Sequence, residues 1–280
     1  QAVKKEQQEV KETPEVVIKK ASFEMFLDLD LIKKGLQVKF LSLSKEKLLL
    51  FDPNSKTLAT INLDKKGQQI QAGKEQLGDG LMASINGGMA FVYSEDKGII
   101  KVDLQNQKVS VVAKPDKEWG GIGDIYGFAG NVYLLDKLNN QIWKYLPTQD
   151  GYSDKRKYFN EGVKVNFEGS MRIQIESSVY VLGQGGEMSR FTKGAPDFFS
   201  YGGLEKNIRD PKSFFVSSDT DNLYILDSGN SRLVVLTKVG MYKDQYESDR
   251  FAMASDLVVD EAGKKVYLLE DNKIYTMELQ

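Results

Sequence analysis

A short block of hydrophobic residues followed by a polar or small residue recurs along most of the 280-residue chain. Each block has four consecutive positions that are mainly apolar or aromatic. The six blocks cover residues 48–52, 90–94, 132–136, 179–183, 223–227 and 266–270. Their first residues lie 42 to 47 positions apart. A nearly constant spacing of this length indicates repeated structural units rather than a single irregular domain.

Each repeat predicts four short antiparallel strands. In the fifth repeat the strands are expected at residues 213–217, 223–226, 232–237 and 241–246, with polar turns between them. Short apolar runs separated by Gly, Asn, Asp and Ser are typical of strands in an antiparallel sheet. Four strands in about 40–50 residues form the blade of a β-propeller. The chain is therefore predicted to be all-β, with six four-stranded blades.

The two ends of the repeat region predict how the ring closes. The sixth repeat has room for only three strands before Gln280, whereas residues 23–31 alternate between apolar and polar and precede the first repeat. We expect this segment to supply the outer strand of the sixth blade, which would protect the last sheet edge. Residues 21–280 then form one propeller domain. Residues 1–20, rich in Lys, Glu and Gln, are predicted to be a charged flexible linker, the alternative being a solvated helix up to Pro14.

Composition excludes several kinds of chemistry. The chain has no Cys and no His, so it has no disulfide, no thiolate or imidazole metal ligand, and no Ser-His-Asp or Cys-His nucleophile. Lys and Arg number 38 against 40 Asp and Glu, and this balance argues against a nucleic-acid partner. The longest apolar run, residues 89–93, is far shorter than a membrane span.

The fifth repeat resembles an NHL repeat. Residues 210–236 contain an Asp-Pro start, an Asn-Leu-Tyr strand and the turn Asp227-Ser-Gly-Asn230-Ser-Arg232 before an apolar strand. The third repeat keeps Asp136 and the Asn three residues later but has Gln in place of Arg. The resemblance implies a divergent six-bladed NHL-like propeller. Such propellers form ectodomains of bacterial membrane-anchored signalling proteins, where a charged linker leads to a transmembrane helix, and others are calcium-dependent lactonases.

The loops predict one functional face. In a propeller, the loops between blades and the turns between second and third strands gather at one end of the central channel. Here the loops between blades are long and polar, while most first-to-second turns are short, and functional residues often lie on long loops carried by a rigid scaffold. The candidate ligand-binding residues on this face are Asp79, Trp119, Asp124, Arg172, Arg209, Asp210, Arg250 and Asp256.

Several of these candidates have two interpretations. Asp124 and Asp256 begin innermost strands, where they could hold Ca²⁺ or a carbohydrate hydroxyl, or could face channel water or tie blades together. Trp119 could be an exposed stacking platform or a cap over its blade. Asp227 and Arg232 are expected to stabilise a turn rather than to bind a ligand. The sequence identifies no catalytic set and no complete metal-ligand set.

The leading hypothesis is a non-enzymatic propeller that binds a protein, peptide or glycan on the loop-rich face. By its resemblance it would be the extracytoplasmic or cell-surface sensor domain of a bacterial signalling protein with an upstream membrane anchor, and we expect a monomer without a required cofactor. The alternative is a calcium-dependent, lactonase-like hydrolase that uses channel-mouth carboxylates. A third interpretation is a purely structural scaffold.

Overall fold

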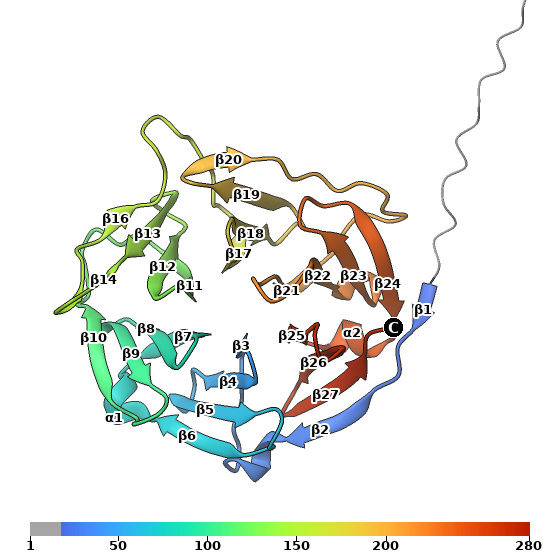
Figure 1. Cartoon of the computed structure of the whole chain (residues 1–280), viewed down its shortest axis with the longest axis horizontal. Helices are drawn as coiled ribbons and strands as arrows, with labels where there is room; N and C mark the ends of the chain where they lie inside the picture. The colour runs from blue at the N-terminus through green and yellow to red at the C-terminus, as the bar shows by residue number, and fades with distance from the viewer. Residues whose placement is uncertain (1–17) are drawn as a thin grey trace, which may run out of the picture.

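A computed structural model describes residues 18–280, and these form a ring of six antiparallel sheets around a central axis (Figure 1). The six-bladed, all-β prediction is confirmed. The four short helical segments are η1 (Leu29–Leu31), α1 (Lys74–Leu77), η2 (Ser228–Asn230) and α2 (Arg250–Met253). Within residues 18–280, no helix has the length and apolar character that crossing a bilayer requires.

Each blade runs from an innermost strand at the channel to an outer strand at the rim. The first blade contains β3 (Phe40–Ser44), β4 (Lys47–Asp52), β5 (Thr57–Asn62) and β6 (Gln68–Ala72). The second contains β7 (Gly80–Asn86), β8 (Met89–Ser94), β9 (Gly98–Asp103) and β10 (Val109–Ala113). The third contains β11 (Ile122–Phe128), β12 (Asn131–Asp136), β13 (Gln141–Tyr145) and β16 (Arg156–Lys157), with a separate ribbon of β14 (Pro147–Thr148) and β15 (Gly151–Tyr152).

The remaining blades follow the same order. The fourth contains β17 (Ser170–Ile175), β18 (Val179–Gly183), β19 (Met188–Thr192) and β20 (Ala195–Asp197). The fifth contains β21 (Pro211–Phe215), β22 (Asn222–Asp227), β23 (Arg232–Thr237) and β24 (Tyr242–Glu247). The sixth contains β25 (Asp256–Asp260), β26 (Lys265–Glu270), β27 (Lys273–Glu278) and, from the other end of the chain, β2 (Glu24–Asp28).

The ring closes as the sequence predicted. Strand β2 pairs antiparallel with β27, from Glu24 opposite Thr276 to Asp28 opposite Lys273. The strand before it, β1 (Ile18–Lys20), pairs parallel with β24 and adds a fifth strand to the fifth blade. These three residues are the end of the range predicted as a linker, and the rest of that range lies outside the described residues.

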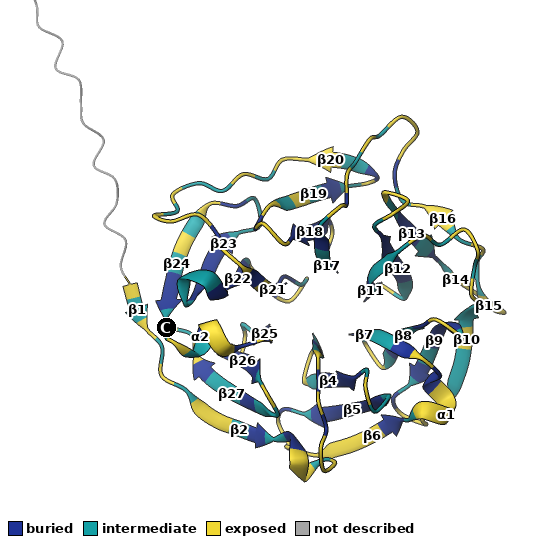
Figure 2. Ribbon diagram, turned by 180° about the vertical axis from the view of Figure 1, so that it is seen from behind, coloured by how far each residue is buried: buried dark blue, intermediate teal, exposed yellow. Residues whose placement is uncertain are grey.

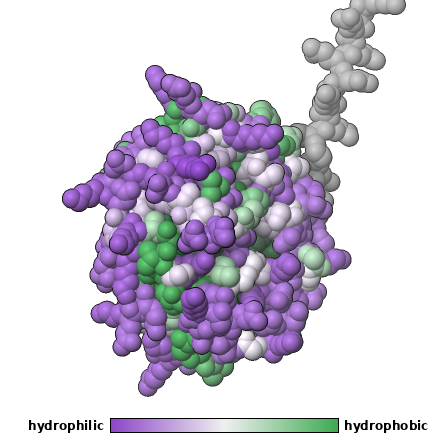
Figure 3. Space-filling model, turned by 60° about the vertical axis from the view of Figure 1, so that its left-hand side comes forward, coloured by the Kyte–Doolittle hydropathy of each residue, from purple (hydrophilic) through white to green (hydrophobic). Residues whose placement is uncertain are grey.

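The hydrophobic blocks are the second strands of the blades, and their side chains are buried on both faces. In β4, Leu48 and Leu50 pack toward the sixth blade, whereas Leu49 and Phe51 pack toward the second. Because neighbouring blades cover both sides, these strands are apolar at consecutive positions instead of alternating. Figure 2 shows burial concentrated in the inner strands, and the surface seen in Figure 3 is mainly hydrophilic with narrow apolar patches.

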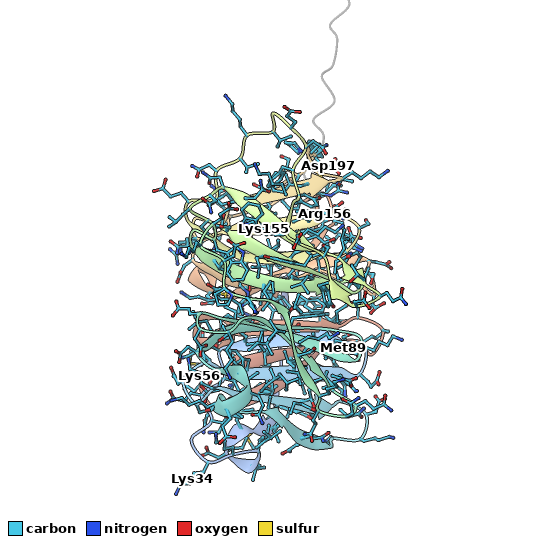
Figure 4. The ribbon with its side chains drawn as sticks, turned by 90° about the vertical axis from the view of Figure 1, so that its left-hand side faces the viewer. Lys34, Lys56, Met89, Lys155, Arg156 and Asp197 are labelled. Atoms are coloured by element: carbon cyan, nitrogen blue, oxygen red, sulfur yellow. The ribbon has the colours of Figure 1, made fainter. Side chains whose placement is uncertain are left out.

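The ring has two distinct faces. The turns between second and third strands and the loops between blades lie on one face, and the turns between first and second strands lie on the other. Seen edge-on in Figure 4, Lys56 of a second-to-third turn and Met89, which follows a first-to-second turn, lie toward opposite sides. We call these the loop face and the turn face.

Candidate functional site

The structure brings three of the predicted site residues together in the central channel. Arg172 of β17 lies between Asp256 of β25 and Asp124 of β11. Its Nη2 is 2.8 Å from Asp256 Oδ2, and its Nε is 3.9 Å from Asp124 Oδ2. The pairing registers of β11 and β17 with their neighbours shift next to Asp124 and Arg172, and such β-bulges redirect side chains at strand ends.

The two carboxylates also bind backbone amides of neighbouring blades. Asp124 Oδ2 accepts a hydrogen bond of 2.9 Å from the Ile173 amide in the fourth blade. Asp256 Oδ2 accepts one of 2.8 Å from the Leu41 amide in the first blade. The other oxygen of each carboxylate accepts from the amide of the next residue, Ile125 or Leu257. All four carboxylate oxygens therefore have partners within the protein.

Burial governs the electrostatics of this cluster. Burial raises the pKa of Asp124 to about 6, although the positive charge of Arg172 and two amide hydrogen bonds oppose the shift. Burial lowers the pKa of Arg172, but the charges of Asp256 and Asp124 outweigh it and hold that pKa above its ordinary value. The guanidinium carbon is 5.3 Å from the centre of the Phe40 ring, which covers one side of the cation. The cluster is a buried ion network.

The space beside this network is small. A cavity of about 20 Å³ lies among the innermost strands of the first five blades, and Asp124 and Arg172 line it together with Ser84, Tyr126, Gln174 and others. That volume holds about one water molecule. Among residues 18–280, no three acidic side chains are arranged so that they could share a metal ion.

Sequence analysis missed a set of polar side chains that link successive innermost strands. Ser42 Oγ accepts from the Ile85 amide at 3.1 Å, and Ser84 Oγ accepts from the Gly127 amide at 3.0 Å. Gln174 Oε1 accepts from the Val216 amide at 2.9 Å. The signal for this role was the recurrence of a polar residue at one strand position in three repeats. These bonds fasten one blade to the next around the channel.

Trp119 is half-buried rather than a free platform. Its Nε1 donates a hydrogen bond of 3.1 Å to the Tyr145 hydroxyl of the third blade. The edge of its ring meets Tyr93 of the second blade, with 5.8 Å between ring centres. Because these contacts join the indole to the second and third blades, the side chain caps the junction of these two blades.

The other predicted site residues lie apart from the channel cluster. Arg250 of α2 forms an ion pair with Glu270 and stacks 3.6 Å from the centre of the Tyr275 ring. Asp210 is exposed and lies 2.8 Å from Lys212 Nζ. The backbone amides of Arg209 and Asp79 donate to Asp227 and Asp96 at 2.8 and 2.7 Å. These contacts hold loops to their own blades and do not form one pocket.

The Asp-Arg turn of the fifth blade is a buried anchor. Arg232 Nε donates to Asp227 Oδ2 at 2.6 Å, and its two other nitrogens donate to Gln245 and to the Lys206 carbonyl. Asp136 has the corresponding role in the third blade, where it accepts from the amides of Gly120 and Gly121. The acidic residue that ends these hydrophobic blocks therefore fixes the loop that enters the blade.

A larger hollow lies on the turn face, where the short turns gave no sign of one. This groove of about 540 Å³ runs between turns of the fifth, sixth and first blades. Its apolar residues are Leu43, Leu63, Phe215, Val259 and Ala262. Its charged residues are Lys45, Glu46, Asp64, Asp219, Asp260 and Glu261. We call it the acidic groove.

Solved propellers share the fold at low sequence identity, while no protein-family model and no curated protein matches the sequence. Virginiamycin B lyase from Staphylococcus aureus is 15% identical, with a TM-score of 0.62 over 92% of this chain and 100% of that one. A catalytically inactive histidine-to-alanine variant of that lyase with quinupristin is similar as well. The gluconolactonase XC5397 from Xanthomonas campestris is 11% identical, with a TM-score of 0.63 over 93% and 90%.

A third similar structure is PorZ from Porphyromonas gingivalis, described as a surface component of the type-IX secretion system. It is 11% identical, with a TM-score of 0.55 over 87% of this chain and 32% of that one. At such identities these likenesses show the propeller fold alone, and the NHL-like assignment remains a prediction.

Proposed function

We propose that this propeller is a non-catalytic binding module. The observation that carries the proposal is the Asp124–Arg172–Asp256 network at the place where a channel-mouth hydrolase would need free carboxylates. A general acid or base must be within reach of substrate and free to exchange a proton. Here each carboxylate oxygen is engaged by a backbone amide, a guanidinium or both, and the adjoining space holds about one water.

The alternative function is a calcium-dependent lactonase, which would require the channel acids to bind Ca²⁺. Ca²⁺ takes six to eight oxygen ligands. Asp124 and Asp256 would be its protein ligands in the channel, yet Arg172 already lies between them and supplies the positive charge. This donor set does not fit the ion, so we assign no calcium-dependent step, and the resemblance to the gluconolactonase supports the fold only.

Lyase chemistry of the virginiamycin B type has less support. That enzyme is catalytically inactive when one histidine is replaced by alanine, and the present chain contains no histidine. The similarity therefore concerns the scaffold only, since this chain lacks histidine, the residue type whose replacement inactivates the lyase.

We further propose that the module acts outside the cytoplasm, as the sensor or binding domain of a bacterial surface protein. The NHL-like fifth repeat supports this location, and so does the fold shared with PorZ, a bacterial surface component. Fluorescence microscopy of the full-length protein with a periplasm-tolerant tag, together with protease accessibility of intact cells, tests it. If the protein stays resistant to protease after the cell envelope outside the cytoplasmic membrane has been permeabilised, the proposal is contradicted.

The binding function is tested by an activity screen of the full chain. We expect no hydrolysis of gluconolactone or p-nitrophenyl acetate above the buffer rate, either with millimolar Ca²⁺ or with EDTA. A thermal shift measured in the same two buffers should show no calcium-dependent change in Tm. Turnover that rises with Ca²⁺ and falls in Asp256→Asn would overturn the proposal in favour of the hydrolase.

A further inference from the structure

The acidic groove is built by turns from three blades. Lys45 and Glu46 come from the β3–β4 turn, and Asp64 comes from the β5–β6 turn of the same blade. Asp219 comes from the β21–β22 turn, and residues 261–263 come from the β25–β26 turn. A volume of about 540 Å³ is within the usual range for ligand pockets, roughly 300–1,000 Å³. The groove is thus large enough to receive several side chains of a partner.

Negative charge dominates the groove rim. Five acidic residues line the groove against one lysine, Lys45. Within the part of the chain that the structure describes, the ion pairs involve none of these five acids. Asp64 and Asp219 are exposed to solvent. Five acids against one lysine leave the groove with a net negative charge, which attracts a positively charged partner.

Two acids of the rim, Glu261 and Asp260, are held in place by hydrogen bonds within the protein. The Glu261 carboxylate accepts from the Tyr224 hydroxyl at 2.7 Å and from the Asn222 side chain and the Asp221 amide. These three donors belong to the fifth blade, whereas Glu261 belongs to the sixth. Asp260 Oδ1 accepts from the Gly263 amide at 2.9 Å. A fixed rim loses little conformational freedom on binding, which favours affinity.

The apolar residues that line the floor of the groove indicate which kind of cation fits. Leu43 and Leu63 of the first blade and Val259 of the sixth form apolar lining beneath the acids. The five acids do not converge on one point as ligands of a metal ion do. A lysine or arginine side chain suits this surface better, since its charged end can reach the rim while its aliphatic stem lies on the floor.

From this we infer that the acidic groove binds a segment of a partner protein in which lysine or arginine residues alternate with small aliphatic residues. The inference rests on the proposed binding function and adds its site and the chemistry of its partner. It also moves the binding surface from the loop face, where the sequence predicted it, to the turn face.

The test uses a fluorescein-labelled, C-terminally amidated Lys-Val-Lys-Val-Lys peptide and the full chain, measured by fluorescence polarisation. We expect saturable binding that weakens with added salt, because the contacts are partly charged. A Glu-Val-Glu-Val-Glu peptide should not bind. The double variant Asp64→Asn/Asp219→Asn should bind about tenfold more weakly, a loss shared between two partly exposed charges.

The matched control is Asp150→Asn/Asp154→Asn, which removes the same charge from exposed positions near the β14–β15 ribbon of the third blade. It should keep the affinity of the parent protein. Ala262→Arg, which places a cation in the groove, should bind as weakly as the groove variant. All variants should keep the parent Tm, since the altered residues are exposed.

Equal weakening in the groove and control variants would overturn the inference, because the peptide would then be responding to net charge alone. No binding of the lysine peptide by the parent protein would also overturn it. Neither result bears on catalysis, whereas calcium-stimulated hydrolysis would overturn the proposed function with or without peptide binding. The two failures are therefore distinguishable.

Discussion

The central channel and the acidic groove both contain carboxylates from separate blades, but these carboxylates differ in burial and in pairing. In the channel, Asp124 and Asp256 are buried, bonded to backbone amides and paired with Arg172. In the groove, Asp64 and Asp219 are exposed and have no ion-pair partner among the described residues. A buried charge must be paired or it destabilises the fold, while an exposed charge is free to meet a partner. The channel therefore serves stability, and the groove is open to recognition.

Opening the ring should have the largest effect, since both regions depend on blades meeting around a closed circle. A chain lacking residues 1–31 loses β2, with its pairing to β27 and the buried Leu27 and Leu29, and also loses the short β1 that pairs with β24. Burial of each leucine contributes about 1.5–3 kcal/mol, and the backbone pairing of β27 is lost as well. We expect Tm to fall by roughly 10 °C or more, measured by circular dichroism.

The deletion of residues 1–31 also removes β1, so a chain that lacks only residues 1–20 is the matched control, because it loses β1 and keeps β2. Its Tm should stay close to that of the full chain. Equal losses in the two deletions would mean that β2 does not carry the closure.

Removing the channel cation should have the next largest effect. Arg172→Met leaves two buried carboxylates without their counter-charge and should lower the free energy of unfolding by roughly 3–5 kcal/mol. Urea denaturation measures this change. The triple variant Asp124→Asn/Arg172→Met/Asp256→Asn removes all three charges and should recover part of the loss. If Arg172→Met is as stable as the parent, the network does not stabilise the ring.

Lowering the pH should increase the contribution of Asp124 to the free energy of unfolding. Its pKa is raised to about 6 in the folded protein against an ordinary value near 3.8, so the folded state holds the proton more tightly than the unfolded state. The stability from this group is fully present below about pH 4 and is lost as the pH rises through 6. The full effect is about 3 kcal/mol, since each pKa unit corresponds to about 1.4 kcal/mol.

The measurement for this prediction compares the parent with Asp124→Asn from pH 4 to pH 7, so that titration of the other carboxylates largely cancels. The parent should gain stability relative to the variant as the pH falls. Parallel stability curves would show that Asp124 does not titrate in this range.

The fold could be predicted well from the sequence because blade packing determines which nearby positions of the chain are apolar. A strand covered on both faces is apolar at consecutive positions, and residues 48–51 show this pattern, which recurs in every repeat. The alternation of residues 23–31 predicted the closing strand, although that strand spans only Glu24–Asp28, is bulged between Met25 and Leu27, and leaves Met25 exposed. Both patterns are set by near neighbours in the chain and by the repeat, so they could be detected without coordinates.

The site was harder to predict because its partners come from distant repeats. Asp124 and Asp256 could be picked out at the starts of innermost strands, and Arg172 at the end of a loop between blades. Their pairing depends on how the ring brings three blades together. Trp119 could not be assigned as a cap without knowing that its ring contacts Tyr93 of the preceding blade. The acidic groove left no signal, since each turn contributes only two or three residues to it.

The smallest expected change in stability gives the sharpest comparison of the two regions. Asp219→Asn and Asp256→Asn are the same chemical change, one at the groove rim and one in the channel. Asp219→Asn should alter the free energy of unfolding by less than about 0.5 kcal/mol and should still weaken binding of the lysine peptide. Asp256→Asn should cost roughly 3 kcal/mol and, at temperatures where the protein is folded, leave peptide affinity unchanged. If Asp219→Asn destabilises the protein as much as Asp256→Asn does, the groove acids belong to the scaffold, and the distinction between a structural channel and a recognising groove is wrong.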